Sequence, residues 1–205
     1  MNKEKYLSDI HDIKEIMDRS SRFISLSGLS GVSAGIIALF GAYFAYLFIY
    51  QESEYFDYKM VGIDETSMFN LFILAGVVLL LSLGSGIFFT SLKAGKNKQK
   101  IWDRNSKRLL SNLMIPLATG GVLCLIFLSR GYVGILAPLT LIFYGLALVN
   151  ASKYTLNEIR SLGILEIVLG LMAMYFIGYG LLFWAIGFGV LHIIYGIIMH
   201  MRYGS

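Results

Sequence analysis

Two ionisable side chains, Glu166 and His192, stand inside long apolar segments of this 205-residue chain. Twelve of its 13 acidic residues lie outside such segments, so Glu166 is the exception. An ionisable group at the centre of a membrane helix costs about 3 kcal/mol on insertion scales, and such groups usually face the bundle interior. Two forms of chemistry stay open: a carboxylate beside a protonated imidazole, or two neutral groups, with Glu166 protonated because burial disfavours its charge.

The spacing of these residues about a turn predicts that they meet. Gly178, Tyr179 and Gly180 separate the last two apolar segments, and so short a connection makes an antiparallel hairpin. Glu166 lies 13 residues before Tyr179 and His192 lies 13 residues after it. At about 1.5 Å per residue, both lie about 20 Å from the turn, at one depth. We expect a Glu166–His192 contact, either as a proton-linked or binding site or as a hydrogen bond joining two helices.

Six apolar segments approach or reach the roughly 17–25 residues that a membrane helix needs. They are residues 23–50, 68–92, 109–129, 132–150, 162–177 and 181–200. Hydrophobic residues make up 57% of the chain and charged residues only 15%, against about 25% in soluble domains. The sequence therefore predicts an all-α integral membrane protein, a six-helix bundle over residues 23–205.

The positive charges fix the expected orientation. Of the 17 Lys and Arg residues, 15 lie in residues 1–22, 93–108 and 151–160 or in the C-terminal tail. Residues 51–66, by contrast, carry mainly acidic charge. Because Lys and Arg are enriched in cytoplasmic loops, both termini are expected in the cytoplasm.

Residues 1–22 form a separate expected element. Apolar residues recur there at steps of three and four, with charged residues between them, at Leu7, Ile10, Ile13 and Met17. This pattern predicts a cytoplasmic amphipathic helix. Its charges are balanced, unlike a strongly basic membrane-surface helix. Two roles stay open for this helix. One is packing on the protein or on the membrane surface, and the other is binding of a cytoplasmic protein partner or of a second copy.

A repeated frame of small residues marks four of the segments. The frames are Gly28-x-x-Gly31-x-x-x-Gly35, Gly163-x-x-Glu166-x-x-x-Gly170, Gly189-x-x-His192-x-x-x-Gly196 and, in weaker form, Pro138-x-x-Leu141-x-x-x-Gly145. Residues three before and four after a central position share its helical face. Small residues let helix backbones approach closely, so these glycines predict helix-packing faces with Glu166 and His192 at two of the centres.

The glycine-framed spans and short outer turns resemble the small bacterial membrane proteins of the HdeD-like kind. The resemblance covers most of the hydrophobic part, but neither residues 1–22 nor residues 51–66. It implies a multi-pass protein of the bacterial cytoplasmic (inner) membrane. It also implies a role in acid or other stress tolerance without an established enzymatic reaction.

Several functional classes are disfavoured by the residues available. One cysteine, Cys124, excludes a multi-cysteine metal or iron–sulfur site. Haem would need axial ligands from opposite sides of the iron, whereas His192 and His200 share one segment and His11 precedes the spans. No cofactor, metal or enzymatic activity is expected. The basic residues 93–108 are typical of a topology-setting loop, so no nucleic-acid partner is expected either.

Two functions follow as expectations. The first is a small transporter or channel-like protein with its polar site between the last two spans, at Glu166 and His192. The alternative is a membrane sensor or scaffold acting through residues 1–22. A polar cavity reaching Glu166 would favour the first, and a dry bundle with a projecting N-terminal helix would favour the second. The lipid bilayer is the expected surrounding, and homo-oligomerisation is plausible for so small a bundle.

Overall fold

The computed structural model describes residues 27–49, 65–96, 102, 104–176 and 178–203, and their regular structure is helical. The predicted N-terminal helix (1–22) and most of residues 51–66 lie outside this part. The long helices are α2 (Gly28–Ile49), α3 (Glu65–Lys96), α4 (Arg104–Ser129), α5 (Leu136–Ala151) and α6 (Asn157–Tyr175). The last segment joins α7 (Gly180–Trp184), the π-helical η3 (Ala185–Leu191) and α8 (His192–Tyr203). Short 3₁₀ turns, η1 (Val133–Ile135) and η2 (Ser152–Tyr154), flank α5.

Both predicted tight turns are confirmed. Gly131 follows α4 with φ +78°, and Gly178 follows α6 with φ +98°. Left-handed backbone of this kind favours glycine, because a Cβ would be strained there. The chain therefore reverses at once after α4 and again after α6.

Five of the described helical stretches are long and apolar enough to cross a membrane: Gly28–Phe48, Met68–Lys96, Asn105–Ser129, Val133–Tyr154 and Gly180–Tyr203. They correspond to five of the six predicted spans. The remaining one, predicted at 162–177, is the 19-residue α6, which begins earlier, at Asn157. Its extra first turn contains Glu158 and Arg160, so α6 carries three charged residues and is not among the five.

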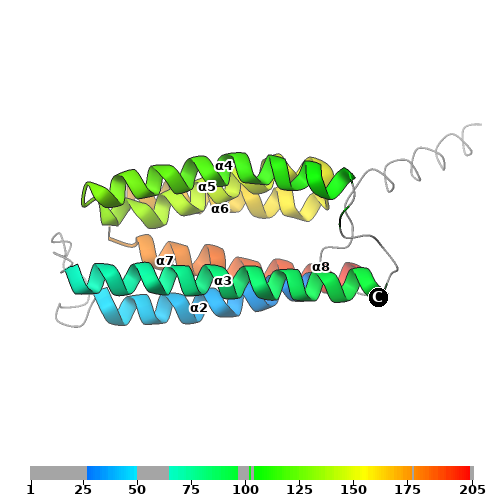
Figure 1. The fold of residues 1–205 in the computed structure, drawn as a ribbon, viewed down its shortest axis with the longest axis horizontal. Helices are drawn as coiled ribbons and strands as arrows, with labels where there is room; N and C mark the ends of the chain where they lie inside the picture. Colours follow the sequence, from blue (N-terminus) through cyan, green and yellow to red (C-terminus); the bar gives the residue numbers. More distant parts are fainter. Residues whose placement is uncertain (1–26, 50–64, 97–101, 103, 177, 204–205) are drawn as a thin grey trace, which may run out of the picture.

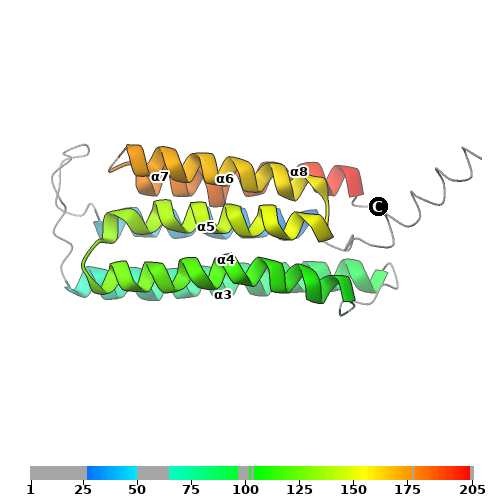
Figure 2. The same ribbon diagram turned by 90° about the horizontal axis from the view of Figure 1, so that it is seen from above.

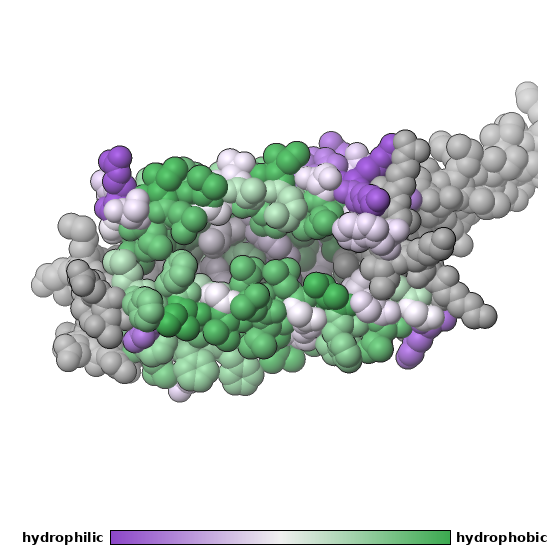
Figure 3. Space-filling view, viewed as in Figure 1, coloured by the Kyte–Doolittle hydropathy of each residue, from purple (hydrophilic) through white to green (hydrophobic). Residues whose placement is uncertain are grey.

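The apolar surface faces outward. Within the most apolar window of α3 no residue is buried, and large exposed side chains such as Phe72, Leu80 and Phe88 cover it. Figure 3 shows apolar residues over most of the visible face, with hydrophilic residues gathered near its two ends. An apolar surface of this extent is typical of a membrane-embedded protein.

The helices form an open ring. Around it, α3 packs on α2, α2 on the last segment, that segment on α6, α6 on α5, and α5 on α4. In the described part of the chain α3 and α4, although consecutive, do not pack together (Figures 1 and 2). The two helices lie on the same side of the molecule, and the space-filling view shows a hollow between them, here called the opening (Figure 3).

Glycines bring α2 against the last segment. A Cβ on Gly28 would collide with the Gly196 carbonyl, and a Cβ on Gly196 would lie 2.7 Å from the Gly28 carbonyl. A Cβ on Gly31 would lie 3.1 Å from Gly196 Cα, and one on Gly35 would lie 2.6 Å from the Gly189 carbonyl. These contacts are between backbones, so side chains larger than glycine would separate the helices.

A second crossing repeats this geometry between α5 and α6. Gly145 and Gly163 face each other, each with its built Cβ 2.5–2.8 Å from the other's carbonyl. A Cβ on Gly170 would lie 3.0 Å from the Pro138 carbonyl and 2.6 Å from Ile142 Cγ1. In the first crossing Gly35 meets the Gly189 carbonyl and Ile193 Cγ1 in the same way. The framed glycines thus lie where the backbones approach closely at both crossings.

The two crossings are equivalent position by position. Gly31 in α2 takes the place that Glu166 holds in α6, and Leu141 in α5 takes the place that His192 holds in α8. Each crossing therefore contains one ionisable and one non-ionisable residue at its centre. Neither crossing needs an ionisable side chain at both centres to pack.

Candidate functional site

The Glu166 carboxyl is fully enclosed. The residue is 0% exposed, and among the described residues neither of its carboxyl oxygens has a hydrogen-bond partner. Burying a carboxylate without hydrogen bonds costs far more than burying its protonated form. A neutral Glu166 is thus the form that fits this arrangement.

Gly187 provides the space for that carboxyl. A Cβ built on Gly187 would lie well inside van der Waals contact of Glu166 Oε2 and 2.6 Å from Leu141 Cδ2. Gly187 belongs to η3, where the chain follows π-helical geometry over Ala185–Leu191. Short π-helical stretches within longer helices often occur at functional sites. Here the stretch places a residue without a side chain opposite the carboxyl.

His192 links three helices. Its Nδ1 lies 3.5 Å from Glu166 Oε1 and 3.0 Å from the Gly187 carbonyl, while its Nε2 lies 2.8 Å from the Tyr144 hydroxyl. A carbonyl only accepts, so Nδ1 carries a hydrogen and donates it to Gly187. In the neutral ring Nε2 then accepts from the Tyr144 hydroxyl, an assignment that follows from the hydrogen-bond network.

The predicted contact between Glu166 and His192 is confirmed. Tight reversal after Gly178 sets α6 and the last segment antiparallel, and equal distances from the turn place the two side chains level. His192 Nδ1 and Glu166 Oε1 lie close together but do not form a well-aligned hydrogen bond, because the Nδ1 hydrogen points to the Gly187 carbonyl. Whether the pair binds a ligand or a proton stays a prediction.

Aromatic rings surround the imidazole. Phe188 lies between Trp184, at a centroid distance of 4.9 Å, and His192, at 5.8 Å with nearly parallel planes. Tyr144 contacts both Phe188, at 4.9 Å, and His192, at 5.4 Å. Tyr144 comes from α5 and the other rings from the last segment, so these contacts cross the interior of the ring of helices.

Tyr144 and Gly187 were missed by sequence reasoning. Neither belongs to the repeated frame, whose central position in α5 is Leu141. Tyr144 lies three residues after Leu141, on nearly the same face of α5, which was the available signal. Nothing in the spacing of the last span indicates its π-helical stretch.

The other candidates stay apart from this site. His200 is exposed near the end of α8, and Cys124 is a free, half-buried cysteine in α4. Within the described ranges there is no group of three or more His, Cys, Asp or Glu side chains that could hold a metal ion. His11 lies outside the described residues.

The arrangement can hold and pass a proton. The Tyr144 hydroxyl, the two imidazole nitrogens and the Glu166 carboxyl follow one another across three helices. Imidazole can accept a proton at one nitrogen and release it from the other, so it is suited to relay a proton.

No protein-family model matches this chain, and neither a curated protein nor a solved structure was found to match it.

Proposed function

We propose that this chain is a six-span protein of the bacterial cytoplasmic membrane and a small proton-linked transporter whose exchange site is Glu166. The unpartnered, fully enclosed carboxyl carries this proposal. An intramembrane carboxyl that serves only packing is expected to have a hydrogen-bond partner, because an unsatisfied buried acceptor costs about 1–3 kcal/mol. A site that takes up and releases a proton or a cation must leave its acceptor available.

Tyr144 and His192 complete the proposed route. Once the Glu166 carboxyl has released its own proton, the imidazole would take a proton at Nε2 from the Tyr144 side and give one from Nδ1 to the carboxylate. The Gly187 carbonyl holds the Nδ1 hydrogen when no transfer occurs. Enzymatic activity and a bound cofactor are not part of this proposal.

The proposed topology has α6 as the fifth of six spans, with both termini in the cytoplasm. Three observations support it: α6 is 19 residues long, packs along α5, and reverses tightly into the last segment. Glu158 and Arg160 then lie at the cytoplasmic end of α6, where Glu158 Oε1 accepts hydrogen bonds from Arg202 and Tyr203. The HdeD-like resemblance, and the stress tolerance it implies, remain predictions.

One observation favours the alternative function. The Glu166 carboxyl is fully buried, and a dry bundle is what a membrane sensor or scaffold would show. Such a protein would act through residues 1–22 on a cytoplasmic partner. A protonation change at Glu166 would then shift helix packing instead of driving transport.

Proton flux in reconstituted vesicles tests the proposal. Purified protein in liposomes with a trapped pH-sensitive dye should dissipate an imposed pH gradient in the presence of substrate. The Glu166→Gln variant, which keeps the shape but cannot ionise, should abolish this flux. Glu158→Gln, the same change eight residues earlier in α6, is the matched control and should retain it. Equal flux in both variants, or none in the parent under any condition, would remove the transporter assignment.

A further inference from the structure

The opening between α3 and α4 leads into the ring of helices. A Cβ built on any glycine of α2, α5, α6, η3 or α8 would meet a neighbouring helix, whereas one built on Gly86 of α3 would have no atom within 4 Å in the described structure. Figure 3 shows the molecule hollowed along this line. Figure 3 shows mainly apolar residues along both sides of this hollow, so in a membrane what enters it comes from the lipid phase.

One contact identifies the inner face of α3. Lys93 Nζ donates to the backbone carbonyl of Tyr203, at the end of α8, so Lys93 points across the ring. Gly86 precedes Lys93 by two helical turns and Ser82 by three, which places both on this inner face. Ser82 is eleven residues before Lys93 and His192 eleven residues before Tyr203, so Ser82 and His192 lie at the same depth.

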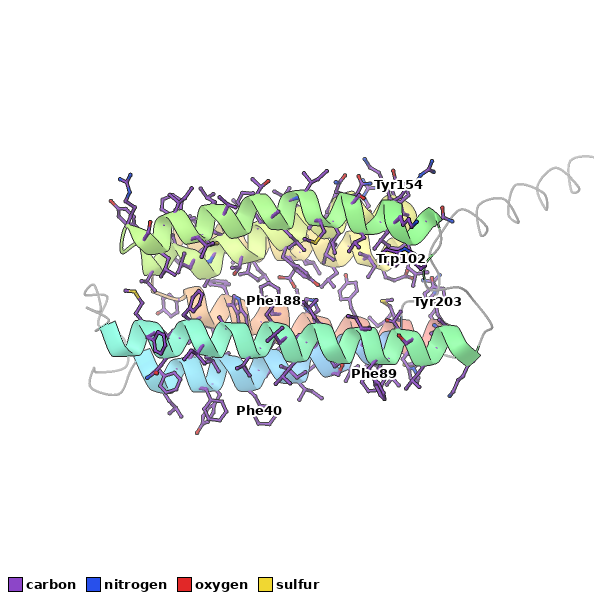
Figure 4. The ribbon with its side chains drawn as sticks, in the orientation of Figure 1. Phe40, Phe89, Trp102, Tyr154, Phe188 and Tyr203 are labelled. Atoms are coloured by element: carbon purple, nitrogen blue, oxygen red, sulfur yellow. The ribbon has the colours of Figure 1, made fainter. Side chains whose placement is uncertain are left out.

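Aromatic rings and the Glu166 site lie behind the opening. Phe188 is visible through it in Figure 4, and both Phe188 and Tyr144 are only half-buried. His192 lies between Tyr144 and Glu166 and is 8% exposed. A molecule inside the ring would therefore meet π faces first and reach the carboxyl after a small movement of the imidazole.

The unsatisfied groups define what would bind. Neither oxygen of the neutral Glu166 carboxyl has a hydrogen-bond partner among the described residues, while His192 and Tyr144, the titratable groups that face it, already bond each other. The missing partner is a hydrogen-bond donor that is cationic when bound. Aromatic faces attract such a cation as well. An alcohol or a carboxylic acid can bond the neutral carboxyl but does not take its proton.

We propose that lipophilic amines enter from the bilayer between α3 and α4 and bind at Glu166. This inference rests on the proposed function and names its substrate class. A neutral amine takes the proton of the Glu166 carboxyl, which leaves a carboxylate beside an ammonium ion. On release the ammonium ion leaves with that proton, and the Glu166 carboxylate then takes up another proton. Ammonium ion and proton thus compete for one carboxylate, which is the requirement for exchange.

Trp184 reports on binding. The chain has two tryptophans, and Trp102 is 64% exposed, so Trp102→Phe leaves the interior Trp184 as the single fluorophore. An alkylamine with a terminal bromine, added to this protein in phospholipid nanodiscs, should quench Trp184 with a saturable dose dependence. The brominated alcohol and carboxylic acid of equal chain length are the probes for non-specific partitioning and should give only a linear response.

Three variants locate the site and the entrance. Glu166→Gln should weaken amine binding about tenfold or more, because a hydrogen bond to a charged group is lost. Gly86→Phe should weaken it similarly, since a helical side chain covers the turn before its own Cα, here the depth of His192. Gly84→Phe, on the outer side of α3 and also in open space, is the matched control and should bind like the parent.

The outcomes separate this inference from the proposed function. Saturable quenching that depends on Glu166 and is blocked only by Gly86→Phe supports it, whatever the flux assay shows. Equal quenching by amine, alcohol and acid, or amine binding unchanged in Glu166→Gln, overturns it even if proton flux is present. Equal binding by the Gly86→Phe and Gly84→Phe variants overturns the entrance between α3 and α4.

Discussion

Gly187 is the position at which an added side chain most directly affects the Glu166 carboxyl. Replacement by alanine adds one methyl group, which would lie inside van der Waals contact of Glu166 Oε2 and 2.6 Å from Leu141 Cδ2. Leu141 and Glu166 are both fully buried, so neither side chain can turn into solvent. The carboxyl must move, and the close contact with His192 must lengthen.

The expected cost follows from overpacking. Inserting a methyl group into a closely packed site costs about 1–3 kcal/mol. Part of this cost comes from Glu166 and part from Leu141, whose Cδ2 is the end of a flexible side chain. In a Glu166→Ala background the larger obstacle is absent. Gly187→Ala should then cost at least about 1 kcal/mol less than in the parent, a coupling typical of residues in contact.

Unfolding in mixed micelles, followed by helical circular dichroism, measures the four members of this cycle. Gly189→Ala is the control, because its methyl group would meet Leu39 and not Glu166. Its cost should be the same with and without the Glu166 carboxyl. A Gly187→Ala cost that is also independent of Glu166 would refute the close approach on which the site is built.

Three further sets of variants test other contacts. Tyr144→Phe removes the hydroxyl that bonds His192 Nε2 and should lower the free energy of unfolding of the parent by about 1 kcal/mol. In a His192→Phe background the same change should cost nothing further. The same unfolding assay measures both values. His192→Phe and Glu166→Gln, made singly and together, should show non-additive stability losses of about 0.5 kcal/mol or more, and full additivity would contradict the contact. Gly28→Leu should lower stability by several kcal/mol, about 3 or more, because backbone atoms of α8 block its side chain, whereas Gly84→Leu in open space should stay within about 0.5 kcal/mol.

The site pair was predictable because it depends on local geometry alone. Helical rise and a tight turn at Gly178 determine which residues of a hairpin lie level, so Glu166 and His192 follow from counting. The glycine frame was predictable for a similar reason, since small residues on one helical face indicate where backbones meet. Both predictions use only the chain positions of the residues and the helix period.

Tyr144 and the opening were not predictable in this way. Tyr144 reaches His192 across the ring from α5, so the contact depends on how non-consecutive helices are arranged. The opening depends on α3 and α4 not closing on each other, although their connection would allow an antiparallel pair. The start of α6 was also not predictable from hydropathy. The helix begins at Asn157, before the predicted residue 162, and its first turn contains Glu158 and Arg160, because helix formation does not require apolar residues.

The two glycine crossings argue that the ionisable pair is not there for packing. At the α2 crossing glycine occupies the centre that Glu166 holds in α6, and the backbones still meet. At the α5 crossing Leu141 occupies the centre that His192 holds in α8, again with close backbone contact. Each of the two ionisable residues therefore has a non-ionisable counterpart at the equivalent position of the other crossing. Since the close approach of helices is achieved by Gly145, Gly163 and their counterparts, the enclosed carboxyl adds a cost that packing does not require. The proposed exchange at Glu166, of a proton for a bound amine, would explain why the carboxyl is there in spite of that cost.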